Sequence, residues 1–113
     1  MIAHVVLFRP KPGLSADDRR SLVTAFERAI REIPTVRNVR VGRRVTLGAG
    51  YEQRMPEAAD YLIVIDFDDL EALRTYLRHP AHEALGARFN QALSSAWIYD
   101  FEVGGLERLQ ELA

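Results

Sequence analysis

The chain has 113 residues, which is the size of one domain and enough for a hydrophobic core of its own. Lys and Arg total 15 against 16 Asp and Glu, so no basic excess points to nucleic acid or to an anionic membrane as a partner. The lack of cysteine excludes disulfides, thiolate catalysis and Cys-ligated metal sites. Because the sequence has neither a membrane-length apolar run nor a signal-peptide pattern, we expect a cytoplasmic protein.

The first half of the chain alternates between strand and helix patterns. Residues 2–9 are apolar in both alternating sets, which predicts a strand covered on both faces, and the PKPG turn at 10–13 ends it. Ser15 is the expected N-cap of an amphipathic helix that stops near residue 33, because the residue before Pro34 avoids helical geometry. Residues 38–46 alternate strictly and predict a second strand.

The second half begins with a loop at 47–59 that is rich in glycine and charge and is long for a small domain. The patterns then predict, in chain order, a strand at 60–67 capped by Asp68 or Asp69, a helix at 71–79, a helix at 81–93 with Pro80 in its first turn, and a strand at 95–103. We divide the chain into a domain at 1–103 and a tail at 104–113 with the composition of a short helix.

The order β-α-β-β-α(α)-β predicts the α+β class and the ferredoxin-like split βαβ fold, a four-stranded antiparallel sheet with helices on one side. The last strand places four large apolar residues on one face: Trp97, Tyr99, Phe101 and Val103. Left exposed, this stripe would be a large apolar patch, so we predict that two sheets pack face to face in a homodimer. The alternative is that the stripe belongs to the core of one subunit and that Asp100 and Glu102 face water.

The three histidines are His4, His79 and His82. His79 and His82 are separated by Pro80 and have no evident third protein ligand, so we expect no metal site. His79 is best interpreted as a capping or loop residue. Taken singly, His4 fits a satisfied core histidine, His82 an exposed residue in a first helical turn, and Tyr76 ordinary helix packing.

The expected topology makes this group more informative. The first and last strands lie side by side and antiparallel, which brings His4 near Asp100. If the Asp100 carboxylate faces the helix side, it needs a hydrogen-bond partner. His4 can be that partner, and the carboxylate would then fix the tautomer of the His4 imidazole. The corner between the two helices carries Tyr76 and His82 and can cover the same edge. A few polar groups in an apolar shell are typical of a small-molecule site.

Three segments, HVVLF followed by the KPG turn, DLEALRTYLRHPAHEAL and IYDFEV, resemble the stress-responsive A/B barrel (Dabb) domain family over residues 2–103. The resemblance implies a dimeric α+β barrel. One enzyme of that family, a plant polyketide cyclase, closes a linear polyketide by C2–C7 aldol condensation. Its catalytic tyrosine and histidine match Tyr76 and His82, and its supporting histidine and aspartate match His4 and Asp100.

Three functions follow as hypotheses. In the first, a cofactor-independent pocket takes a small apolar carbonyl compound; His82 is the general base, Tyr76 binds the carbonyl oxygen, and His4 with Asp100 orients the reactants. In the second, the protein is a non-enzymatic, stress-related binding protein, with the arginines at 40, 43 and 44 as a partner surface unless they are simply solvated. The third is a cofactor-independent monooxygenase or isomerase of a related barrel family.

Overall fold

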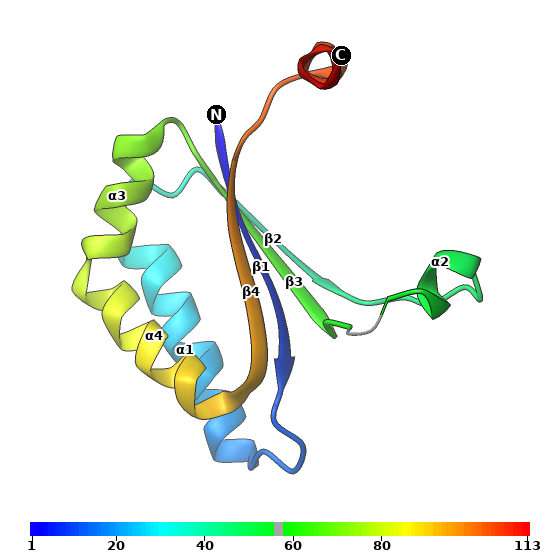
Figure 1. Ribbon diagram of the computed structural model, residues 1–113. Helices are drawn as coiled ribbons and strands as arrows, with labels where there is room; N and C mark the ends of the chain where they lie inside the picture. Colours follow the sequence, from blue (N-terminus) through cyan, green and yellow to red (C-terminus); the bar gives the residue numbers. More distant parts are fainter. Residues whose placement is uncertain (56–57) are drawn as a thin grey trace.

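A computed structural model describes residues 1–55 and 58–113 and shows a sheet with helices packed on one face (Figure 1). The elements in chain order are β1 (Ile2–Pro10), α1 (Ala16–Glu32), β2 (Asn38–Arg43), α2 (Gly50–Gln53), β3 (Tyr61–Phe67), α3 (Leu70–Arg78), α4 (Pro80–Ala92), β4 (Leu93–Glu102) and the 3₁₀ helix η1 (Leu106–Leu112). No helix in the described residues is long and apolar enough to cross a membrane.

The four strands form one antiparallel sheet in the order β2-β3-β1-β4. Helices α1, α3 and α4 lie on one side of it, whereas α2 and η1 extend toward the other side (Figure 1). This arrangement confirms the predicted ferredoxin-like α+β fold. We call the side of the sheet away from α1, α3 and α4 the open face.

The core lies between the sheet and the helix layer. On β1 the helix-facing set contains Ile2, His4, Val6 and Phe8, all buried, as the two-faced apolar pattern of this strand requires. The largest fully buried side chains are Tyr76, Phe67, Ile33 and Ile65, drawn from α3, β3 and the end of α1. Tyr76 is therefore part of the core as well as a candidate site residue.

Capping residues set the helix boundaries. Ser15 Oγ accepts a hydrogen bond from the Asp18 backbone N–H at 3.0 Å, and Asp69 does the same for Ala72 at 2.8 Å, so both predicted caps are present. His79 is the N-cap of α4, with its Nδ1 accepting from the Ala81 N–H at 3.0 Å. The interpretation of His79 as a capping residue is thus confirmed.

Two parts of the chain differ from the sequence-based expectation by more than two residues. Strand β2 ends at Arg43 rather than at residue 46, because its pairing with β3 stops where β3 begins. The expected loop at 47–59 contains the helical turn α2. The Glu52 carboxylate stabilises this turn by accepting hydrogen bonds from the backbone N–H groups of Leu47 and Gly48. Positions 56–57 of that loop lie outside the described residues.

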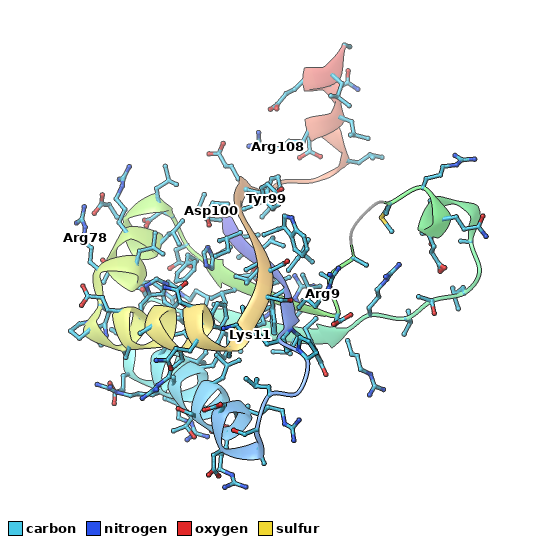
Figure 2. All side chains as sticks on the ribbon, turned by 60° about the horizontal axis from the view of Figure 1, so that its bottom comes forward. Arg9, Lys11, Arg78, Tyr99, Asp100 and Arg108 are labelled. Atoms are coloured by element: carbon cyan, nitrogen blue, oxygen red, sulfur yellow. The ribbon has the colours of Figure 1, made fainter. Side chains whose placement is uncertain are left out.

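The aromatic stripe of β4 lies on the open face. Trp97, Tyr99 and Phe101 pair with Leu7, Val5 and Ala3 of β1 and so share their side of the sheet. Tyr99 and Phe101 are 51% and 52% exposed, so the stripe does not belong to the core of the subunit. Figure 2 shows Tyr99 and its neighbour Asp100 projecting to opposite sides of β4.

Candidate functional site

A cavity of about 330 Å³ lies between α4 and the β1–β4 part of the sheet. His4, Tyr76 and His82 all line it. The other lining residues are mainly apolar: Val6, Phe26, Ile65, Leu85, Gly86, Phe89, Asn90, Leu93, Ser94, Ser95, Ala96 and Ile98. Three of the four predicted site residues therefore meet in one space, and the fourth, Asp100, contacts the cavity through His4.

The break between α3 and α4 brings Tyr76 and His82 together. Pro80 cannot donate a backbone hydrogen bond but suits the first turn of a helix, and the His79 side chain caps the new helix. The chain therefore changes direction at His79. This change of direction brings the rings of Tyr76 and His82 together, with their centroids 4.8 Å apart.

Antiparallel pairing of β1 with β4 places His4 directly opposite Asp100. Their side chains meet with His4 Nδ1 2.5 Å from Asp100 Oδ1. Because a carboxylate only accepts, the proton of this hydrogen bond belongs to Nδ1, which leaves Nε2 of a neutral ring as an acceptor. The His4 side chain is 5% exposed and that of Asp100 is 42% exposed, so the pair spans from the core to the solvent edge.

His4 also contacts Tyr76, with ring centroids 5.8 Å apart in an edge-on arrangement. The side of the Tyr76 ring is closed by Phe67, with centroids 5.1 Å apart. The order of rings is therefore His4, Tyr76, His82, with the phenol in the middle. This packing holds the Tyr76 side chain in one orientation.

The surroundings give Tyr76 and His82 complementary protonation states. Burial raises the pKa of Tyr76 to about 12, so its hydroxyl remains protonated and can donate a hydrogen bond at neutral pH. Burial is the main cause that lowers the pKa of His82, and the electrostatic interaction with His4 acts in the same direction, while the Leu77 backbone and Glu83 act in the opposite direction. His82 is therefore a neutral base at pH 7, beside a neutral hydrogen-bond donor.

Several cavity residues were not identified from the sequence. Gly86, Phe89 and Asn90 lie four, seven and eight positions after His82, which is the spacing of one face of α4. The helical period counted from His82 would have revealed them. A Cβ added at Gly86 would meet no atom within 4 Å, so this glycine leaves part of the cavity open.

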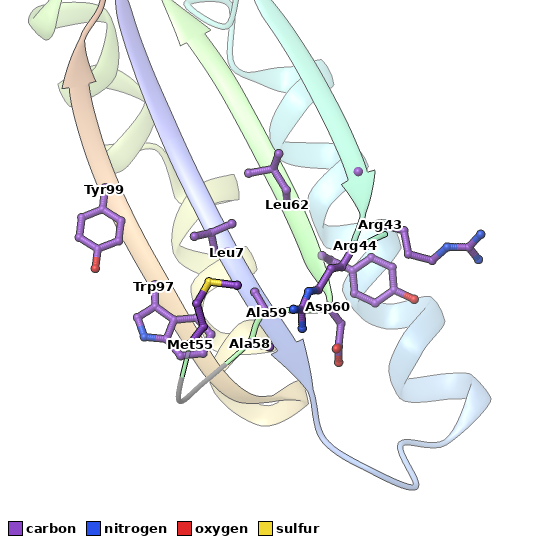
Figure 3. Close-up of a pocket in the computed structure, with 12 residues that line it drawn as sticks. Leu7, Arg43, Arg44, Met55, Ala58, Ala59, Asp60, Leu62, Trp97 and Tyr99 are labelled. Atoms are coloured by element: carbon purple, nitrogen blue, oxygen red, sulfur yellow. The ribbon is translucent and has the colours of Figure 1, made fainter. Parts of the chain in front are cut away.

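No group of three or more His, Asp or Glu side chains suited to a metal ion occurs in residues 1–55 and 58–113. His79, the third histidine, does not line the cavity, since its Nδ1 caps α4. The imidazole of His82 and the phenol of Tyr76 offer acid–base and hydrogen-bonding chemistry at the cavity. A second hollow, the open-face cleft of about 730 Å³, is lined by Leu7, Gly42, Arg43, Arg44, Met55, Ala58, Ala59, Asp60, Tyr61, Leu62, Trp97 and Tyr99 (Figure 3).

The chain resembles several known proteins over most of its length. An uncharacterised protein of Streptomyces coelicolor, SCO4036, is 33% identical over 104 residues, covering 90% of this chain and 99% of that protein. Olivetolic acid cyclase of Cannabis sativa is 19% identical over 100 residues, covering 88% and 94%. A dimeric ferredoxin-like protein of unknown function from Thermobifida fusca superposes with a TM-score of 0.69 and 27% identity, covering 90% of each chain.

The model of one family spans the sheet and the helices described above. It is described as the stress responsive A/B barrel domain and matches residues 2–103, from the start of β1 to one residue beyond β4. The chain belongs to the stress responsive A/B barrel (Dabb) domain family.

Proposed function

We propose that the protein is a homodimeric, cofactor-independent acid–base enzyme that acts on a small apolar carbonyl compound in the cavity beneath α4. The observation that carries this proposal is that a neutral imidazole, His82, and a protonated phenol, Tyr76, line the same cavity with ring centroids 4.8 Å apart. The site residues proposed are His82 and Tyr76 as catalytic groups, with His4 and Asp100 as supporting groups.

The proposed step is abstraction of a proton from the carbon next to a carbonyl group. His82 takes the proton, and the electron pair of the C–H bond moves to the carbonyl oxygen, giving an enolate. Tyr76 donates a hydrogen bond to that oxygen as its negative charge develops. In a substrate with a second carbonyl group, the enolate carbon would form a new C–C bond there, and His82 would return its proton to the resulting alkoxide. These steps are the aldol addition, and loss of water from the β-hydroxy carbonyl product would complete the aldol condensation of a polyketide-cyclase-like reaction.

The walls of the cavity favour a ligand that is largely apolar. A second space of about 440 Å³ under α1 shares Phe26 and Phe89 with the site cavity and is lined almost entirely by apolar side chains. A movement of these two rings would join the spaces, which suits a carbonyl compound with an apolar tail. The similarity to olivetolic acid cyclase supports the reaction class but not a particular substrate.

The homodimer is supported by the open face. Val5, Leu7, Tyr99 and Phe101 form an apolar surface there that the helices of the same subunit leave uncovered. Packing this surface on the same surface of a second copy would remove it from water. The dimeric state of the Thermobifida fusca relative, which is 27% identical, agrees with this proposal.

A direct test does not require the natural substrate. The protein is incubated in D₂O with a panel of 1,3-diketones and β-ketothioesters that carry alkyl tails of increasing length, and exchange of the α-proton is followed by NMR. Enzyme-dependent exchange that disappears in His82→Ala is expected. Binding without exchange in the wild type would instead favour the non-enzymatic binding protein, and oxygen consumption would favour the monooxygenase alternative.

A further inference from the structure

The C-terminal segment carries an apolar stripe that its own subunit does not cover. In η1 the leucines at 106, 109 and 112 recur every third residue, and a 3₁₀ helix has about three residues per turn. The three side chains therefore lie in line along one side of the helix. They are 81%, 57% and 84% exposed, and every other residue of η1 is exposed as well.

A helix of this kind does not hold its shape alone in water. 3₁₀ segments longer than about four residues are uncommon, and short isolated helices are marginal without packing. Among the residues that the structure describes, the side chains of η1 make polar contacts: Arg108 pairs with Glu102 at the end of β4 and with Glu111 of η1 itself, and Glu107 accepts a hydrogen bond from the Gly105 backbone N–H. Surface ion pairs of this type contribute little, so the leucine stripe needs a packing partner from elsewhere.

The open-face cleft has the complementary chemistry. Its floor and walls are apolar, with Leu7, Leu62, Met55 and Trp97 exposed to the hollow (Figure 3). On the same side of the sheet as this cleft, η1 extends away from its own subunit (Figure 1). The cleft is also continuous with the proposed dimer surface, because Leu7 and Tyr99 belong to both.

The charges at the two surfaces also match. The rim of the cleft carries Arg43 and Arg44, which are exposed and form no ion pair among the described residues, together with a single acid, Asp60. In η1 the cation Arg108 is already paired with acids, which leaves Glu107 to supply negative charge beside the leucine stripe. An acidic, leucine-bearing helix therefore fits a basic-rimmed apolar cleft.

We infer that η1 of each subunit docks into the open-face cleft of its partner, so that residues 104–113 are an exchanged arm of the homodimer. This inference rests on the proposed homodimer. The cleft lies where Leu7 pairs with Trp97, whereas the tail leaves the sheet beyond the pair of Ile2 with Glu102. These positions are about 17 Å apart along β1. The tail of one subunit can reach the cleft of the other only if the two-fold axis of the dimer is perpendicular to the strands. The two stacked sheets then run in opposite directions, and the end of one sheet that carries the tail lies over the end of the other that carries the cleft.

The tryptophan gives the docking a spectroscopic signal, because Trp97 is the one tryptophan in the chain and it lines the cleft. The test variant replaces the three leucines at 106, 109 and 112 with serine. The control is Leu70→Ser on α3, on the helix side of the sheet, a leucine that is 51% exposed, close to the 57% of Leu109. Sedimentation measures dimerisation, and Trp97 emission and acrylamide quenching are measured on the dimer.

We expect the dimer Kd of the triple variant to rise by at least roughly tenfold. In the dimer that remains at high concentration, Trp97 emission should shift to longer wavelength and its quenching should increase, with neither change in the control. Unchanged Trp97 signals in a triple variant that is still dimeric would overturn the arm exchange and leave the homodimer intact. A wild-type protein that sediments as a monomer at every concentration would overturn the homodimer itself.

Cross-linking checks the same geometry without removing a leucine. Because the chain has no cysteine, Gln110→Cys and Gly42→Cys are each the only thiol in their variant. A Cβ at Gly42 meets only the Leu62 Cβ, at 4.0 Å, so this position at the cleft accepts a side chain. A short bis-maleimide should cross-link two subunits when Gln110→Cys and Gly42→Cys are co-expressed, and it should not do so when either variant is expressed alone. Efficient joining of Gln110→Cys to itself would place the two tails together and contradict the docking.

Discussion

Tyr76 and His82 lie on different helices, yet their ring centroids are 4.8 Å apart at one cavity. The short distance depends on His79, which ends α3 and caps α4, and on Pro80, which starts α4. Had α3 continued as one straight helix, positions 76 and 82 would project about 120° apart at two levels of the helix. The break is therefore what places a hydrogen-bond donor beside a base.

Substitution of His82 and Tyr76, the two proposed catalytic groups, should lower the rate of α-proton exchange and preserve the fold. For His82→Ala we expect enzyme-dependent α-proton exchange to fall by about 10²–10⁴-fold, the usual contribution of a general base. Tyr76→Phe should cost about 10²-fold, because the phenol donates to the developing enolate oxygen. Exchange is measured by NMR and folding by circular dichroism. The matched control is His79→Asn, which keeps a good N-cap outside the cavity and should retain exchange. Full activity in His82→Ala would contradict its role.

The lowered pKa of His82 has consequences for activity and stability. The base should stay neutral as the pH falls through 6.5, so the rate of α-proton exchange should decline only below the ordinary histidine range. The unfolded chain binds this proton more readily than the folded one, so the free energy of unfolding should also fall as the pH drops below 6.5 and through the folded pKa. Urea unfolding at several pH values measures this, and His82→Gln should remove this part of the pH dependence. An activity inflection above 6.5 would contradict the assignment.

Two substitutions at Gly86 test ligand binding in the cavity separately from the stability of α4. Its missing side chain leaves open space, so Gly86→Ala should raise the free energy of unfolding by about 0.5–1 kcal/mol through helix propensity alone. Gly86→Leu should instead occupy the cavity beside His82 and Tyr76 and abolish ligand binding in a folded protein. Calorimetry with the same diketone panel and urea unfolding give the two readouts. Undiminished binding by the leucine variant would place the ligand elsewhere.

The pair His4–Asp100 should be coupled in both stability and activity. Asp100→Ala removes the hydrogen-bond acceptor of a buried imidazole and should lower the free energy of unfolding by about 1 kcal/mol. This value is at the low end for such a loss, because water can reach the position of the half-exposed carboxylate. A double-mutant cycle with His4→Phe measures the coupling by urea unfolding. Asp100→Asn, which still offers an oxygen acceptor, should recover most of it. Additive single-variant effects would show that the contact does not contribute.

Two consecutive residues of β4 test the dimer surface. Tyr99 faces the open side and Ile98 the helix side, and they are 51% and 53% exposed. Tyr99→Glu would bring two like charges toward each other across a two-fold interface and should yield a monomer, whereas Ile98→Glu should remain a dimer. Sedimentation velocity over a range of concentrations distinguishes the two. Equal dimerisation of both variants would mean that the open face is not the interface.

Local signals predicted the elements of this protein well. The strands β1, β3 and β4 follow from runs and alternations of apolar residues, and the helices follow from Ser15, Asp69 and Pro80, since each of these acts within a few residues of itself. The end of β2 and the turn α2 were missed. The first depends on where β3 offers a pairing partner and the second on a carboxylate, Glu52, that reaches back to the backbone of the loop.

The pairing of His4 with Asp100 could be predicted, because an antiparallel neighbour relation between the first and last strands sets which residues face each other. The composition of the cavity wall could be predicted only in part. Gly86, Phe89 and Asn90 follow the helical period from His82, whereas Phe26 comes from α1 and meets the others only through helix packing.

The sequence by itself determined the strand and helix types, the caps, the order of the elements and hence the fold, because these depend on residue patterns over short distances. Only the tertiary structure decided that three rings from β1, α3 and α4 line one cavity, that Tyr76 is buried enough for its pKa to rise to about 12, and that the aromatic stripe of β4 stays uncovered. Burial and ring-to-ring distance are properties of packing between distant segments, and no short stretch of sequence contains them.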